Sequence, residues 1–236
     1  MVCTGATEGM TTKDSPEKGH WHVRDVVLAT LVYFAVVVPL SLLLGSSGVS
    51  DPKGYLIASE INVLAYVLVT YLLRGKYPLK ILHIPYTSLF IQYVFIGTLA
   101  CIFLNFPNKI WGGNFDNIPK QYTFFVEYSF FDKVVFLSVL CLIGPILEEI
   151  LFRGFIYRIL SQRFDIFWGA LGSTVLFALG HNLPLRGIVI VAITGLVYCY
   201  VYEKTQSILT SIIVHSLNNT LWFGVVYWGI KRHASI

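Results

Sequence analysis

The feature that most constrains the fold is the recurrence of apolar runs of about 20 residues, the length that an α-helix needs to cross a bilayer. The runs cover residues 26–44, 55–73, 89–106, 131–160, 166–182, 187–202 and 208–230. Of the 236 residues, 56% are hydrophobic and 13% are charged, whereas soluble domains average roughly 25% charged residues. The sequence therefore predicts an all-α, polytopic transmembrane helical bundle with about seven spans.

The stretch 107–130 is rich in aromatic residues but too polar to span. We expect a loop with a short amphipathic or partly inserted helix over KQYTFFVEYSFF; entry of this stretch into the membrane would make eight spans. The chain is then divided into a polar N-terminal tail (1–24), N-terminal spans with the aromatic loop (25–130), a catalytic transmembrane core (131–230) and a tail (231–236).

The distribution of Lys and Arg predicts the orientation of the chain. Loops that face the cytoplasm carry an excess of these residues, and in the first two hairpins the excess falls on the side of the N-terminus. We therefore expect a multi-pass integral membrane protein with a cytoplasmic N-terminus. The first 24 residues are polar and lack the apolar region of a secretory signal. The net charge of +4 is small and indicates basic residues near the membrane surface, not a nucleic-acid partner.

Three ionisable residues, Glu148, Glu149 and Arg153, interrupt the apolar segment GPILEEILFRG. A charged residue at the centre of a span costs about 2.5–3.5 kcal/mol, so such residues are treated as functional by default. Glu149 and Arg153 are one helical turn apart and suit an ion pair, which could serve packing alone. Glu148 lies about 140° around the helix from Arg153. It is left without this partner and is a candidate general base.

The adjacent Gly144 and Pro145 predict a kink, because proline cannot donate to the carbonyl four residues earlier. The kink could open space beside Glu148 or serve packing only.

Two further polar groups interrupt later apolar runs: His181 in FALGHN, and His215 with Asn219 in SIIVHSLNN. Each could simply bond neighbouring helices. Counting 1.5 Å per residue from the side where the fourth run ends, these residues and Glu148 come to roughly 12–24 Å of depth. A bilayer core is about 30 Å thick, so we expect the four side chains in one slab of the bundle.

Together these residues resemble the motifs of the CAAX-protease and bacteriocin-processing family, also called the Abi family of intramembrane proteases. Glu148-Glu149-x-x-x-Arg153 is similar to its EExxxR motif. The FxxxH and HxxxN motifs are matched by Phe177 to His181 and by His215 to Asn219. The three motifs occur in the family's order, and the resemblance covers about residues 130–225.

The resemblance implies a helical intramembrane endopeptidase. Glu148 would be the catalytic carboxylate, supported by Glu149 and Arg153, and His181 would help to hold or activate the water. His215 and Asn219 would stabilise the oxyanion, a role that suits two side chains on one helical face. No cofactor is implied, and the substrate would be a membrane-anchored or lipidated protein or peptide, cleaved by CAAX-type, C-terminal or leader processing.

Three alternatives stay open from the sequence. The first is a zinc-dependent version of the same hydrolase with His181, His215 and Glu148 as ligands, although no HExxH is present. The second is a proton-coupled membrane transporter, in which intramembrane Glu and His residues form a relay. The third is a non-catalytic immunity or scaffold protein. The four cysteines show no metal-type spacing and are expected to be inert thiols.

Overall fold

A computed structural model describes residues 84–105, 120–181 and 183–234, with isolated positions between residues 24 and 68. Every regular element within these ranges is helical. The expected spans 26–44 and 55–73 and most of the stretch 107–130 lie outside the described residues. The elements are Thr87–Asn105 (α3), Lys120–Phe124 (α5), Phe130–Ser138 (α6), Val139–Ile143 (η4), Gly144–Glu149 (α7), Ile150–Tyr157 (η5), Arg158–Arg163 (α8), Ile166–Leu179 (α9), Leu185–Thr205 (α10) and Ile208–Ala234 (α11).

Four helices in the described ranges are long and apolar enough to cross a membrane: Thr87–Asn105, Phe130–Arg163, Leu185–Thr205 and Ile208–Arg232. They correspond to the third, fourth, sixth and seventh expected spans, so the all-helical class is confirmed. The fifth expected span, 166–182, is only partly realised. Its helix α9 has 14 residues, which gives about 21 Å at 1.5 Å per residue, less than a bilayer core of about 30 Å. The total of seven spans and the cytoplasmic N-terminus stay predictions.

Local sequence explains where several of these helices begin and end. Ser129 and Asp165 each accept a backbone N–H three residues later and so cap α6 and α9. Gln206 closes α10 in the left-handed conformation with φ 51°. Between α8 and α9 the chain turns tightly, and a Cβ on Gly169 would lie 2.6 Å from the backbone nitrogen of Ser161. Only glycine permits this close approach.

The longest helical stretch, Phe130–Arg163, contains two π-helical segments, η4 and η5. The irregularity that the sequence predicts as a kink at Pro145 is a π-helical turn that ends directly before the Gly144-Pro145 pair. In this turn the N–H of Gly144 donates to the carbonyl of Val139, five residues earlier. Segments of this kind are rare and occur often at functional sites.

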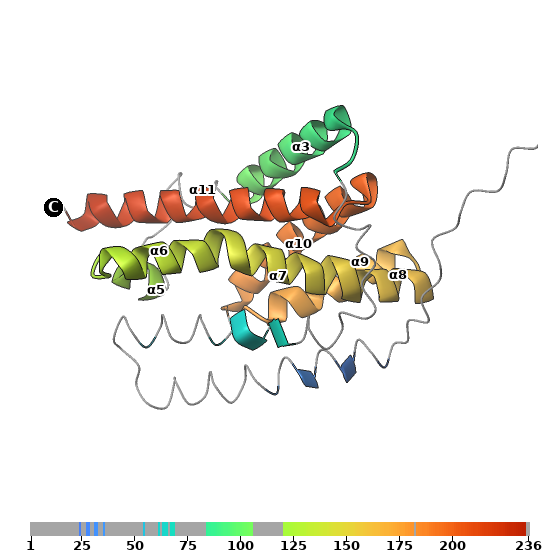
Figure 1. Ribbon diagram of the computed structural model, residues 1–236, viewed down its shortest axis with the longest axis horizontal. Helices are drawn as coiled ribbons and strands as arrows, with labels where there is room; N and C mark the ends of the chain where they lie inside the picture. The colour runs from blue at the N-terminus through green and yellow to red at the C-terminus, as the bar shows by residue number, and fades with distance from the viewer. Residues whose placement is uncertain are drawn as a thin grey trace, which may run out of the picture.

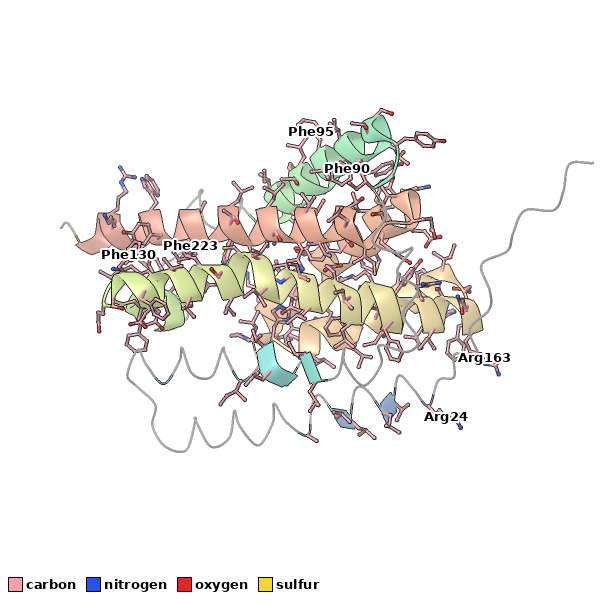
Figure 2. All side chains as sticks on the ribbon, viewed as in Figure 1. Arg24, Phe90, Phe95, Phe130, Arg163 and Phe223 are labelled. Carbon is pink, nitrogen blue, oxygen red and sulfur yellow. The ribbon has the colours of Figure 1, made fainter. Side chains whose placement is uncertain are left out.

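Helix α11 contacts α3, α7, η4 and α10, while α9 packs against α8, α10 and η5 (Figure 1). The buried core includes Leu151, Phe155, Phe177 and Val214. The outer face is also apolar: Phe95 is 63% exposed and projects away from α3 (Figure 2). Large exposed apolar side chains are unfavourable in water but suit a surface in contact with lipid.

The short helix expected in KQYTFFVEYSFF is present as α5. Its Tyr122 and the neighbouring Phe125 are 7% and 6% exposed and pack with Phe136 of α6 and Phe223 of α11. The described aromatic side chains of this segment therefore join α6 to α11, and Phe223 can be seen between these helices (Figure 2).

Candidate active site

The predicted ion pair between Glu149 and Arg153 is present and fully enclosed. Glu149 Oε1 lies 2.9 Å from Arg153 Nη1, and both side chains are 0% exposed. The guanidinium also donates through Nη2 to the carbonyl of Gly195 at 3.0 Å. The rings of Phe177 and Tyr198 flank it, with centroids 4.6 Å and 5.1 Å from Cζ. One carboxylate of the adjacent pair is therefore neutralised within its own helix.

Glu149 has a second partner that the sequence does not predict. Its Oε1 also lies 2.9 Å from Nδ1 of His215 on α11. A carboxylate oxygen only accepts, so an ionised Glu149 requires the proton of this bond to sit on Nδ1. Glu149 thus orients the His215 ring and leaves Nε2 pointing away from the ion pair.

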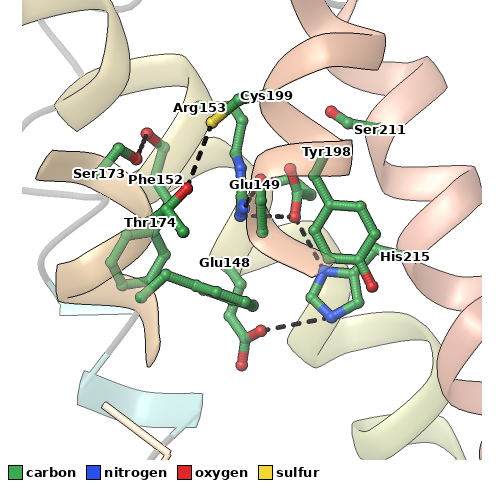
Figure 3. Close-up of polar contacts among 12 residues, drawn as sticks. Glu148, Glu149, Phe152, Arg153, Ser173, Thr174, Tyr198, Cys199, Ser211 and His215 are labelled. Carbon is green, nitrogen blue, oxygen red and sulfur yellow. Dashed lines mark hydrogen bonds and ion pairs between the residues drawn. The ribbon is translucent and has the colours of Figure 1, made fainter. Parts of the chain in front are cut away.

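Glu148 lies on the other side of the same imidazole (Figure 3). Its Oε2 is 3.6 Å from His215 Nε2, and its side chain is 16% exposed. The two adjacent glutamates therefore contact the two ring nitrogens of one histidine. Glu149 is enclosed, whereas Glu148 keeps an exposed edge, which is the asymmetry expected from the positions of the two residues relative to Arg153.

A tyrosine that sequence reasoning missed holds the other face of His215. The rings of Tyr198 and His215 are stacked, with centroids 4.5 Å apart and an interplanar angle of 21°. The Tyr198 hydroxyl accepts from Asn218 Nδ2 at 3.0 Å, and Asn218 Oδ1 accepts from Asn105 Nδ2 at 3.2 Å. Tyr198 sits in the aromatic run YCYVY, so its sequence context gave no signal. Asn218 belonged to a polar group already noted, and Asn105 ends the third span.

His181 approaches the site through an aromatic contact. Its Nδ1 lies 2.8 Å from the carbonyl of Phe177, and the two rings are 4.7 Å apart. Phe177 in turn lies 5.8 Å from the His215 ring. Among the described residues, no hydrogen bond or ion pair joins His181 to Glu148. Because a carbonyl only accepts, Nδ1 carries the proton, and Nε2 of a neutral ring is an acceptor.

Asn219 is bound to the backbone of the helical stretch that carries Glu148 and Glu149. Its Nδ2 donates to the carbonyl of Leu140 in η4 at 2.9 Å. Asn219 follows His215 by one turn of α11, so the two side chains share a face of this helix. The sequence predicted that shared face but not the contact with η4.

The alternative left open by the sequence is a metal site with His181, His215 and Glu148 as ligands. Within the part of the chain that the structure describes, no group of three or more His, Cys, Asp or Glu side chains is arranged to hold a metal ion. His181, His215 and Glu148 are therefore not gathered as a set of three ligands. The thiols of Cys101 and Cys199 are buried, and Cys141 is half-buried; all three are free.

The fold and the site define a class of protein: a helical membrane protein with an enclosed Glu-Arg-His cluster and one accessible carboxylate beside it. Comparisons with known proteins are consistent with that class. Residues 130–221 match the model of the family described as type II CAAX prenyl endopeptidase, Rce1-like. The match covers less than half of the chain and agrees with the resemblance seen in the three motifs. The matched range contains the described cluster from Glu148 to Asn219.

The chain also resembles a Bacillus subtilis (strain 168) protein named "Putative membrane peptidase YdiL". The two are 33% identical over 79 residues, which cover 34% of this chain and 32% of that protein. The similarity therefore spans about a third of the length of each protein. No solved structure matches the chain.

Proposed function

We propose that the chain is an intramembrane endopeptidase that hydrolyses a peptide bond in a membrane-anchored or lipidated protein or peptide, with Glu148 as the general base. The observation that carries this proposal is the difference between the two adjacent carboxylates. Glu149 is 0% exposed and bound by Arg153 and His215. Glu148 is 16% exposed, and its one ion-pair partner among the described residues is Nε2 of His215 at 3.6 Å. An accessible carboxylate in an otherwise enclosed site suits proton abstraction from water.

The proposed reaction begins at Glu148. Glu148 takes a proton from a water molecule, and the resulting hydroxide attacks the carbonyl carbon of the substrate peptide bond. The C–N bond then breaks, and Glu148 returns the proton to the leaving amine nitrogen. His181 is suited to hold the attacking water because its Nδ1–H donates to Phe177, leaving Nε2 as an acceptor.

The oxyanion that forms during attack needs hydrogen-bond donors. An amide nitrogen carries two hydrogens, and Asn219 uses one of them on Leu140. The second can donate to the oxyanion. His215 Nε2, in its protonated form, can provide the other bond, while Glu149 keeps the ring in place through Nδ1. Donors fixed before the reaction stabilise the transition state without reorganisation.

Within this proposal the reaction needs no metal. Asparagine is a poor zinc ligand, and the two ring nitrogens of His215 face two carboxylates. The family description, type II CAAX prenyl endopeptidase, supports a prenylated substrate of the CAAX type. The bilayer would bring such a substrate to the bundle.

The test uses the purified full chain in detergent and a quenched fluorescent peptide that ends in a farnesylated CAAX sequence. We expect cleavage by the wild type, identified by mass spectrometry, and at least a hundredfold loss in Glu148→Gln. The matched control is Glu127→Gln, an exposed glutamate between α5 and α6, which should cleave at the wild-type rate. Near-wild-type cleavage by Glu148→Gln would remove Glu148 from the mechanism. No cleavage by the wild type would reject the farnesylated CAAX substrate.

A further inference from the structure

The Gly144-Pro145 pair takes no part in the mechanism above, yet Pro145 lies only three residues before Glu148. Its effect is on the carbonyl of Leu140. In an α-helix this carbonyl would accept the N–H of Gly144, and in a π-helix it would accept the N–H of residue 145. The N–H of Gly144 is bound to Val139 instead, and Pro145 has no N–H. Both backbone donors that could serve Leu140 are therefore removed.

Asn219 fills the place of the missing donor. Its Nδ2 lies 2.9 Å from the Leu140 oxygen. This bond also fixes which way the amide points, because the opposite orientation would bring the Oδ1 acceptor against the carbonyl acceptor. With one N–H held by the backbone, the second N–H of the same nitrogen has a set direction. The Leu140 carbonyl, which has no backbone donor, thus orients the Asn219 side chain that we propose as an oxyanion donor.

Gly144 is needed for the same arrangement. A Cβ at this position would lie 2.8 Å from the Val139 oxygen, closer than real Cβ contacts allow. A larger residue would push the π-helical turn open and disturb the bond that keeps the Gly144 N–H away from Leu140. Gly144 permits the π-helical turn, and Pro145 leaves the carbonyl of Leu140 without a backbone donor.

We propose that Gly144 and Pro145 are positioning residues for Asn219: they expose the Leu140 carbonyl, which holds the Asn219 amide in the direction needed to bind the oxyanion. The inference rests on the proposed function for its catalytic consequence. Its structural part, the competition between residue 145 and Asn219 for one carbonyl, stands by itself. Two measurements address the two parts separately.

The structural measurement is the side-chain amide spectrum of 15N-asparagine-labelled full chain in detergent micelles, with the Asn219 signals assigned from Asn219→Ala. Pro145→Ala supplies an N–H that competes for Leu140, so we expect the Asn219 amide signals to shift. The control is Pro85→Ala, which replaces another buried proline, located before α3, and should leave these signals in place. Unchanged Asn219 signals in Pro145→Ala would overturn the proposal, whether or not the protein cleaves the peptide.

The kinetic measurement is a double-mutant cycle with the farnesylated CAAX peptide. Losing one oxyanion donor typically lowers turnover by about 10²–10³. Pro145→Ala should lower kcat by about tenfold or more, up to that limit, and leave KM unchanged. In the Asn219→Ala background the same change should have no further effect, because Pro145 acts through Asn219. An equal loss in both backgrounds would refute the coupling. Wild-type turnover by Asn219→Ala would instead reject the oxyanion role, and the spectra would still decide the positioning.

Discussion

Removing one partner of the Glu149–Arg153 pair should destabilise the protein strongly, and removing both should restore much of the loss. Both side chains are 0% exposed, so solvent does not screen the charge left behind. Breaking a buried pair from one side costs roughly 3–5 kcal/mol, whereas replacing both members by apolar residues of similar volume is often neutral or stabilising. We therefore compare Glu149→Leu, Arg153→Met and the double variant.

The contacts of the pair predict that the two single variants differ. In Arg153→Met, the remaining Glu149 still accepts from His215 Nδ1 at 2.9 Å. In Glu149→Leu, Arg153 keeps the Gly195 carbonyl and two aromatic rings but has no anionic partner among the described residues. His215 also loses the carboxylate that binds its Nδ1. Glu149→Leu should be the less stable of the two. For a chain of this size, about 3–5 kcal/mol corresponds to a fall in Tm of roughly 6–20 °C.

The assay is thermal unfolding of the purified variants in one detergent, followed by the monomer fraction on size exclusion. Glu127→Leu, an exposed glutamate, controls for the loss of a carboxylate and should melt like the wild type. The double variant should recover at least half of the larger loss in Tm but should stay inactive, since His215 still lacks Glu149. Single variants that melt at the wild-type temperature would refute the argument that this pair holds the bundle together.

Two further predictions concern the histidine and the metal. Tyr198→Phe should keep most activity because the ring stacked on His215 remains. Tyr198→Ala should lower kcat at least tenfold and destabilise the fold by about 3–5 kcal/mol, the usual cost of removing a buried aromatic ring. Equal kcat values for the two variants would exclude the stacking role. Elemental analysis of purified protein should find no stoichiometric zinc, and cleavage of the peptide should survive exhaustive chelation. Zinc that is lost together with activity, and restores activity when returned, would establish the metal-dependent alternative with His181, His215 and Glu148 as ligands.

The sequence predicts those features of the site that depend on spacing along one helix. The Glu149–Arg153 pair follows from a separation of four residues, and the shared face of His215 and Asn219 follows from the same rule. Four helices appear where apolar runs of sufficient length occur. Each of these features needs only the rise and the period of the α-helix, so a single sequence contains the information.

The features that could not be predicted depend on how helices rotate and pack. Counting residues gives the depth of His215 and Glu149 but not the directions they face, so their contact across 66 residues of chain is not visible in the sequence. Tyr198 is one aromatic residue among several in its run, and only packing selects it as the partner of His215. The π-helical turn before Pro145 also changes the helix phase, which a regular period of 3.6 residues cannot represent.

The two π-helical segments connect the stability of the bundle to the geometry of its site. A side-chain donor from another helix binds a backbone carbonyl in each segment: Asn219 of α11 binds Leu140, and Ser173 of α9 binds Phe152 at 2.8 Å. In an apolar interior such bonds matter because a carbonyl that lacks a protein donor finds no water molecule to supply one. The bonds that hold α9 and α11 against the glutamate-bearing helix therefore also help to position the segment that carries Glu148 and Glu149. A substitution at Ser173 should consequently affect turnover as well as unfolding, although its side chain lies outside the three family motifs.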